Sequence, residues 1–405
     1  MYTDILDRFT RSGKPVTDLS RFRGLMHALG DPQEGLRFIH VAGTNGKGSA
    51  VRMLSRICSL SGYRTGEFTS PYIERYNDRI CIDGKYIPDE DIERLLGIVM
   101  QHVHGDEGYS QFEITTAVAL LWYAEQSCDI VVFECGLGGL LDCTNIIDTG
   151  IVQLIMSVSY DHTAVLGDTL HDIAVQKAGI IKPSVPTVLY APNDGEVVDV
   201  VRDTADRLGS PLIMPDISLI SDERITGEGC SFSYKGRTYT TAMTGHHQIY
   251  NAAAVIEAAG VIRKILSRIT DDTVHAGIAC AKVPLRLETV GSSPLIIRDG
   301  AHNPDAMRRL AEYVRSLPQS PKVLVYGQMT SKDYITSARE IGPFVDRVIC
   351  IDDFAPGQST VPADTLASLF PDAVTSPSAE ACDRAAAMAG TDGAVIIAGS
   401  LYIKS

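Results

Sequence analysis

Seven consecutive residues near the N-terminus have the composition of a phosphate-binding loop. The run Gly43-Thr44-Asn45-Gly46-Lys47-Gly48-Ser49 follows a short apolar stretch and precedes a helical pattern. Glycines let backbone amides turn toward a phosphate, the start of a helix favours an anion, and Lys47 adds a positive charge. The literal Walker pattern is not met, because Val41 stands where its first glycine would be and Gly48 separates the lysine from the serine. A glycine-rich turn that binds nothing is the alternative, but the strand-loop-helix context favours phosphate binding.

Three side chains outside this loop have types suited to phosphate or metal chemistry. Glu134 ends the apolar run Asp129–Phe133. An acid that holds a metal is expected at such a strand end, although a solvated acid or a helix cap has the same pattern. His162 lies just past another predicted strand, where a histidine is either structural or a ligand. Lys177 lies in a helical pattern with apolar neighbours, which fits either a surface charge or a partly buried lysine with a lowered pKa.

Two later clusters also contain polar groups that could contact a ligand. Asn251 belongs to residues 245–252, the polar start of an alanine-rich helical pattern. Asp299 and His302 follow a predicted strand in the order Asp299-Gly300-Ala301-His302-Asn303-Pro304. This order predicts either an acid–histidine pair or an aspartate cap before a helix that begins at proline.

Alternating strand and helix patterns indicate the elements that position these residues. Strands are predicted at Leu36–Val41, Asp129–Phe133 and Ile151–Met156, and a helix is predicted at Gly48–Gly62. Such alternation is typical of a parallel sheet with helices on both faces. Ser231–Thr241, with a Lys-Gly pair between alternating residues, predicts a hairpin.

A second series of strands begins near Pro294. It is predicted at Leu295–Arg298, Lys322–Tyr326, Arg347–Ile351 and Ala394–Ala398, with helical patterns between the strands. We therefore predict an α/β protein with two domains. The first, residues 1–288, contains a P-loop-type parallel sheet with helices on both faces. The second, residues 289–405, is a smaller Rossmann-like α/β domain.

Composition restricts the partners and the location. With 45% apolar and 21% charged residues, the chain has the composition of a globular protein. A net charge of −14 argues against nucleic acid and anionic membranes but allows a small anionic substrate in a positive pocket. The longest apolar stretch, Ala117–Ala124, is far shorter than the roughly 20 residues that a bilayer requires. No export signal is visible, and nine scattered cysteines fit a reducing cytoplasm.

Taken together, these segments resemble the folylpolyglutamate synthase/dihydrofolate synthase branch of the Mur ligase superfamily. The resemblance follows the family's order and spans residues 39–402. The matching segments are Ile39–Ser49, Phe68-Thr69-Ser70-Pro71, Phe112-Glu113, Gly136-Leu137-Gly138-Gly139 with Leu141-Asp142 and Thr144-Asn145, Asp161-His162-Thr163 with Leu166-Gly167, Lys177–Lys182, His247-Gln248 with Asn251-Ala252, Asp299–Pro304, and Gly399-Ser400-Leu401-Tyr402.

The resemblance implies an ATP-dependent ligase. A carboxylate of a folate or of dihydropteroate attacks the γ-phosphate of ATP, and the amine of glutamate then displaces phosphate from the acyl phosphate. Because two anions must meet, cations are required, and the implied cofactors are ATP and Mg²⁺, with K⁺ allowed as a second cation. The family further implies a monomer that acts on small molecules.

The resemblance also implies roles for individual residues. The implied catalytic residues are Lys47, Glu134, His162 and Lys177, and Lys177 matches a lysine that is carbamylated in many members. The implied ATP-binding residues are the Gly43–Ser49 loop, Asn251, Arg286, Asp299 and His302. The implied magnesium ligands are Ser70, Glu134 and His162, and the implied folate-binding residues are Phe112 and Asp142.

Several residues depart from the family pattern without removing a proposed catalytic group. Tyr72 stands where histidine is common, Leu140 replaces an arginine, and Gln176 replaces an acid beside the lysine. Val283 and Leu285 replace the first and third residues of a Trp-Pro-Gly-Arg pattern. These departures leave open which folate form is used.

Three other classes of protein compete with this interpretation. A Mur-type ligase that acts on a cell-wall precursor would share the ATP chemistry, but the Lys-Gly-Ser ending of the loop and its early position favour the folate branch. A P-loop GTPase or kinase is disfavoured because no Asn-Lys-x-Asp motif occurs and because a nucleotide switch would not need the Asp299–His302 region. A non-catalytic nucleotide-binding scaffold would not require Lys47, Glu134 and His162.

Overall fold

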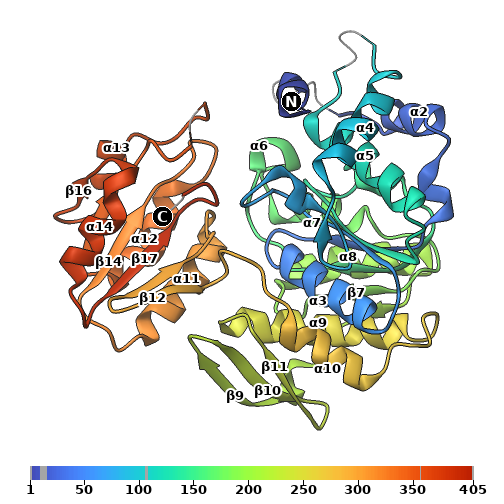
Figure 1. The fold of residues 1–405 in the computed structure, drawn as a ribbon. Helices are drawn as coiled ribbons and strands as arrows, with labels where there is room; N and C mark the ends of the chain where they lie inside the picture. The colour runs from blue at the N-terminus through green and yellow to red at the C-terminus, as the bar shows by residue number, and fades with distance from the viewer. Residues whose placement is uncertain (1, 10–15, 105–107, 356, 404–405) are drawn as a thin grey trace.

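An eight-stranded sheet forms the centre of the larger part of the molecule. The computed structural model describes residues 2–9, 16–104, 108–355 and 357–403 (Figure 1). The strand order is β4 (Lys85–Tyr86), β3 (Ile80–Ile82), β2 (Thr65–Phe68), β5 (Ile130–Glu134), β1 (Phe38–Ala42), β6 (Gly150–Ile155), β7 (Thr187–Leu189) and β8 (Leu212–Ile213). All neighbours from β2 to β8 are parallel, and β3 and β4 add an antiparallel edge. The predicted α/β class is confirmed, and the sheet is mixed rather than wholly parallel.

Helices cover both faces of this sheet because its strands are apolar on both sides. In β1, Ile39 and Val41 pack on one face against α3 (Lys47–Leu60), α9 (His246–Ile262) and α10 (Asp271–Cys280). Phe38 and Ala42 point to the opposite face. That face is covered by α2 (Ser20–Ala28), α4 (Asp89–Met100), α5 (Gln111–Glu125), α7 (Leu170–Ala178) and α8 (Gly195–Leu208). Continuous apolar strands of this kind are typical of a buried parallel sheet.

A small antiparallel sheet packs below α9 and α10 (Figure 1). It contains β9 (Ile220–Thr226), β10 (Gly229–Tyr234) and β11 (Arg237–Thr241) in the order β11-β10-β9. The last two strands form the hairpin that the sequence predicted around Lys235 and Gly236, with Tyr234 opposite Arg237.

The C-terminal part is built on its own six-stranded sheet, orange to red in Figure 1. The strand order is β12 (Glu288–Ser292), β13 (Leu295–Arg298), β17 (Ala394–Ala398), β14 (Lys322–Tyr326), β15 (Arg347–Cys350) and β16 (Val374–Thr375). Among the strands that the structure describes in this sheet, only β12 runs antiparallel to its neighbour. One face packs against α11 (Pro304–Ser316), α12 (Tyr334–Ile341) and α13 (Ala363–Ala367), and the other packs against α14 (Ser378–Ala389). The division of the chain at residues 288 and 289 stays our proposal.

The parallel order brings the candidate residues together. Val41 pairs with Glu134 in the register of β1 and β5, and the loops after β1, β2, β5 and β6 leave the same edge of the large sheet. The loops that follow β13 and β14 in the six-stranded sheet contribute further candidate residues from the C-terminal part. Ligands bind characteristically at such edges in α/β proteins. In the described part of the chain, no helix combines the length and apolar character needed to span a bilayer.

Candidate active site

The loop between β1 and α3 has a backbone that is suited to an anion. Gly43 and Gly46 have φ of 149° and 84°, and a Cβ atom at Gly46 would lie 2.7 Å from Oδ1 of Asn251. Glycine is therefore required at this position. The loop is fixed at its start because the Thr44 amide donates to the carbonyl oxygen of Ser157 at 2.6 Å. The first amides of α3, which begins at Lys47, have no acceptor within the helix and can bind a phosphate.

Lys47 extends from the start of α3 toward the end of β5. Its ammonium donates to the carbonyl oxygen of Thr44 at 3.2 Å and lies 3.9 Å from Oε1 of Glu134. Both side chains are largely buried. The phosphate loop and the strand-end acid, which the sequence suggested separately, therefore belong to one site.

Burial strongly affects the pKa of Glu134, the acid at the end of β5. Loss of solvent raises the pKa of its carboxyl group to about 7, while Lys47 and the Ser70 amide, 3.4 Å from Oε2, favour the charged form. A carboxylate held this deeply is stabilised by an additional cation. Glu134 is thus a reasonable place for a metal ion to bind.

Lys177 lies on α7 and faces the same pocket. It is buried, and burial together with the nearby Lys47 ammonium lowers its pKa to about 7. The structure therefore selects the buried lysine over the surface charge that the sequence also allowed. A substantial fraction of this side chain is a neutral amine near neutral pH.

The donors near Glu134 fit a magnesium ion that takes several ligands from phosphate and water. The Ser49 hydroxyl is buried without a hydrogen-bond partner, and the carboxylate of Glu134 lines the same pocket. Among the described residues, no three acidic, histidine or cysteine side chains converge as a metal cage. Mg²⁺ commonly binds through one or two protein oxygens together with substrate phosphates. The residues present fit that mode of binding.

The C-terminal part completes the site from the other side. Both carboxylate oxygens of Asp299 accept backbone hydrogen bonds at 2.8 Å, from the amides of Leu287 and Ala301. His302 donates from Nδ1 to the carbonyl oxygen of Gly300 at 2.7 Å, and burial lowers its pKa to about 4. Its Nε2 is thus unprotonated near neutral pH. Asp299 therefore connects the backbone at Leu287, which follows Arg286, to the turn that contains His302.

A pocket between the eight-stranded sheet and the six-stranded sheet contains nearly all the predicted site residues. Its walls include every predicted catalytic, ATP-binding and metal-binding residue: Gly43, Thr44, Asn45, Gly46, Lys47, Gly48, Ser49, Ser70, Glu134, His162, Lys177, Asn251, Arg286, Asp299 and His302. Their roles in binding remain proposals. Gln248 and Arg309 also line this pocket and were not among the predicted site residues.

The two predicted folate-binding residues lie behind the glycine-rich segment 136–139, whose Gly136, Leu137 and Gly138 form part of the pocket wall. A Cβ atom at Gly136 would lie 2.6 Å from the ring of Phe112, so the ring packs closely on this segment. Asp142 is buried, and its carboxylate accepts hydrogen bonds from the amides of Leu137 at 2.8 Å and Thr144 at 2.9 Å. In this structure both residues shape the segment rather than line the pocket.

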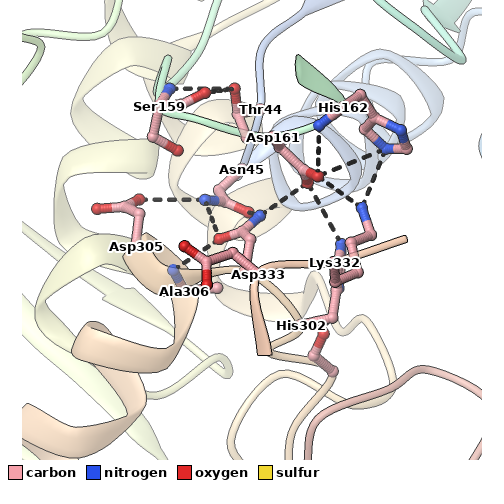
Figure 2. Close-up of polar contacts among 12 residues, drawn as sticks. Thr44, Asn45, Ser159, Asp161, His162, His302, Asp305, Ala306, Lys332 and Asp333 are labelled. Carbon is pink, nitrogen blue, oxygen red and sulfur yellow. Dashed lines mark hydrogen bonds and ion pairs between the residues drawn. The ribbon is translucent and has the colours of Figure 1, made fainter. Parts of the chain in front are cut away.

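A network of polar residues joins the two parts of the protein (Figure 2), and its members Asp161, Asn303 and Lys332 were not among the predicted site residues. Lys332 lies 2.7 Å from Oδ1 of Asp161 and 3.1 Å from Nε2 of His162. Burial would raise the pKa of Asp161, but Lys332 and the neighbouring imidazoles lower it below its ordinary value. Asp161 also accepts from Nδ2 of Asn303 at 3.0 Å. Lys332 lies in the loop after β14, six residues beyond Tyr326, so the strand-end rule that identified Glu134 gives no signal for it.

Comparisons with known proteins identify the class of this fold and site. Residues 41–259 match the Mur ligase middle domain, and residues 285–401 match the Mur ligase, glutamate ligase domain. The protein therefore has the two catalytic domains of a Mur ligase.

Individual relatives define the branch. A dihydrofolate synthase/folylpolyglutamate synthase of Bacillus subtilis is 37% identical over 330 residues, which cover 78% of this chain and 76% of the relative. The chain belongs to the folylpolyglutamate synthase/dihydrofolate synthase family, as the sequence motifs predicted.

Solved structures agree with this assignment. Escherichia coli FolC in complex with DHPP and ADP has a TM-score of 0.86 at 27% identity, with 99% of this chain and 94% of that chain covered. The bifunctional folylpolyglutamate synthase/dihydrofolate synthase from Yersinia pestis, complexed with AMPPNP and Mn ion, has a TM-score of 0.86 at 27% identity. That match covers 99% of this chain and 95% of the relative.

Proposed function

We propose that this protein uses ATP to join the amino group of glutamate to a carboxylate of a folate, of dihydropteroate, or of both. The observation that carries the proposal is the pocket in which the phosphate loop and Glu134 face Asp299 and His302 across two domains. The names of the Bacillus relative and of the FolC complex with DHPP and ADP support the substrate class.

The proposed reaction has two steps. A carboxylate oxygen of the folate attacks the γ-phosphorus of ATP, the bond to the β-phosphate oxygen breaks, and ADP leaves. The glutamate amine then attacks the acyl carbon, loses a proton and expels inorganic phosphate, which leaves an amide.

In this proposal, the residues of the pocket bring the anions together. Lys47 and the first amides of α3 hold the phosphates of ATP, and Asn251, Arg286, Asp299 and His302 complete the nucleotide site. Ser70, Glu134 and His162 would hold Mg²⁺, which when bound supplies positive charge to the phosphates. Burial of these groups strengthens every charge interaction and keeps water from a reactive acyl phosphate.

We further propose that Lys177 is carbamylated in the active enzyme. Carbamylation requires a neutral amine, and the lowered pKa of this buried lysine supports it. The carbamate would replace a cation with an oxygen-bearing anion beside the magnesium site. K⁺ remains a proposed second cation, tested by replacing potassium with sodium salts in the same assay.

Phe112 and Asp142 are proposed to act on the pterin through the glycine-rich segment that they support. Asp142 holds the amide of Leu137, and Phe112 packs on Gly136, so both set the shape of this wall. The proposed enzyme is a cytoplasmic monomer. Its nine cysteines all have free thiols, as expected in a reducing compartment, and light scattering would test the oligomeric state.

A phosphate-release assay tests the substrate class. Purified protein, ATP, Mg²⁺ and glutamate are combined separately with dihydropteroate, tetrahydrofolate and a UDP-muramyl peptide. Release that depends on both glutamate and a pterin substrate is the expected result. Release with the muramyl peptide alone would instead establish the cell-wall alternative.

A further inference from the structure

A reciprocal amide pair connects the phosphate loop to the C-terminal domain. Asn45 donates from Nδ2 to Oδ1 of Asn303 at 3.3 Å, and Asn303 donates from Nδ2 to Oδ1 of Asn45 at 3.2 Å. Asn45 also donates to Oδ2 of Asp305 at 3.1 Å (Figure 2). The side chain of this loop residue is therefore directed to the other domain, while its backbone remains in the loop.

A second connection lies beside the first. The Lys332 ammonium contacts Asp161 at 2.7 Å, and about a tenth of each side chain is exposed, 11% and 8% respectively. Asn303 joins the two connections because its Nδ2 also donates to Asp161 at 3.0 Å. Charge-assisted hydrogen bonds in such shielded places are stronger than those on an open surface.

Each of these contacts involves a proposed ligand-binding residue or a neighbour of one. Asn45 precedes Gly46 and Lys47, Asp161 precedes His162, and Asn303 follows His302. A displacement of the C-terminal domain would thus separate His302 from the phosphate loop. Displacements of about 1 Å between reacting groups can cost about 10²-fold in rate.

The apolar contacts do not provide this alignment. Among the described residues, no apolar cluster combines residues from 2–283 with residues from 287–403. The mutual position of the domains beside the pocket thus depends on polar pairs. Polar pairs can exchange with water at modest net cost, which suits a contact that forms and breaks.

We infer that Asn303 and Lys332 are positioning residues that dock the C-terminal domain on the phosphate loop and on Asp161, so that His302 and Lys47 face one ATP. The inference rests on the proposed function for its catalytic consequence. The docking itself is independent of the substrate. In this role, Asn303 and Lys332 align the two domains and do not themselves contact a ligand.

The test uses substitutions that leave the local structure intact. Asn303 is the N-cap of α11 and accepts from the amide of Ala306 at 2.9 Å. Serine also caps helices well, so Asn303→Ser keeps the helix start and removes the cross-domain amide. Lys332→Met removes the charge, and Lys332→Arg retains it. Arg315→Met removes an exposed cation from the same domain and is the matched control.

Small-angle scattering without ligands measures docking, and glutamate-dependent ADP formation measures its consequence. The Asn303→Ser/Lys332→Met double variant should have a larger radius of gyration than wild type. Its kcat/KM should fall by at least about ten-fold with an unchanged melting temperature. Lys332→Arg should restore most of the activity, and Arg315→Met should match wild type in both measurements.

Superimposable scattering profiles of the double variant and wild type would overturn the inference. A larger radius of gyration of the double variant with an unchanged kcat/KM would also overturn the inference, because the contact would then not position the reacting groups. Since the scattering measurement needs no turnover, it judges docking independently of the proposed ligase reaction. A failure of the substrate assignment is thereby distinguished from a failure of this inference.

Discussion

The Lys47 ammonium lies 3.9 Å from the carboxylate of Glu134, at the point where the first turn of α3 meets the end of β5. Neither side chain is paired closely enough for an ideal salt bridge, and both are largely shielded from water. The space between a cation and a buried acid is suited to a phosphate with its metal ion. Lys47 would bind the anion, and Glu134 would bind the cation that accompanies it.

Removal of the Lys47 charge should abolish turnover without unfolding the protein. We expect Lys47→Ala to lower kcat by at least about 10²-fold, because a preorganised cation that stabilises the transferring phosphate is lost. ADP formation in the folate assay measures this effect. The exposed Lys264→Ala is the control. A folded Lys47→Ala variant with near-normal turnover would contradict the assignment of the phosphate loop.

The buried Glu134 should make stability depend on pH. Its pKa is about 7 in the folded protein against an ordinary value of 4.5, so the folded state binds the proton more tightly. The resulting stabilisation is complete below about pH 4.5 and is lost as the pH rises through about 7. Glu134→Gln does not titrate. It should therefore gain stability relative to wild type over this interval, on the order of 3 kcal/mol in total.

Urea denaturation at about pH 5 and about pH 8 measures this difference in the free energy of unfolding. The free energy of unfolding of Glu134→Gln should exceed that of wild type by more at about pH 8 than at about pH 5. Glu90→Gln, an exposed acid on α4, is the matched control and should show little pH-dependent difference. If Glu134→Gln increased the free energy of unfolding by the same amount at both pH values, the raised pKa of Glu134 would be contradicted.

Glu134 and His162 should also determine the magnesium requirement. We expect Glu134→Gln and His162→Ala each to raise the Mg²⁺ concentration for half-maximal activity by at least about ten-fold, because a proposed ligand is lost. A Mg²⁺ titration of ADP formation at saturating ATP is the measurement. His171→Ala, which changes an exposed histidine on α7, should keep the wild-type requirement. An unchanged requirement in both site variants would reject the site.

Local sequence patterns were sufficient to predict three of the strands of the large sheet, β1, β5 and β6, and the candidate residues that follow them. Glycines before Lys47 and an acid at the end of an apolar run identify strand ends. The parallel register then brings Val41 and Glu134 side by side. This arrangement of β1 and β5 does not depend on the C-terminal domain.

Relationships across the two domains could not be predicted in this way. Lys332 and His162 are 170 positions apart, and their contact depends on how the sheets are placed relative to each other. No local periodicity encodes that placement.

Leu285 shows a second limit of sequence reasoning. It stands where the family pattern has glycine, and its φ is 57°, a conformation that costs a residue with a side chain on the order of 1 kcal/mol. Its side chain is buried at 3% exposure, which offsets that cost. The departure from glycine therefore keeps the backbone turn before Arg286, although the residue type alone would not indicate a left-handed conformation.

Lys177 provides the most demanding prediction. With a pKa of about 7, its amine is largely neutral at about pH 8, and carbon dioxide can add to it. Labelled bicarbonate should therefore be incorporated at Nζ, and incorporation should decline as the pH falls below about 7, because the amine becomes protonated. Lys177→Ala should lose at least about 10²-fold in kcat.

Chemical rescue separates the carbamate from the lysine itself. A short carboxylate such as formate or acetate could occupy the space left in Lys177→Ala and supply the missing oxygen atoms. We expect partial recovery of turnover by these anions and none by chloride at equal ionic strength, with the rescue absent in Lys47→Ala. An unmodified Nζ in a crystal structure prepared with bicarbonate, together with normal activity of Lys177→Ala, would exclude carbamylation as part of the reaction.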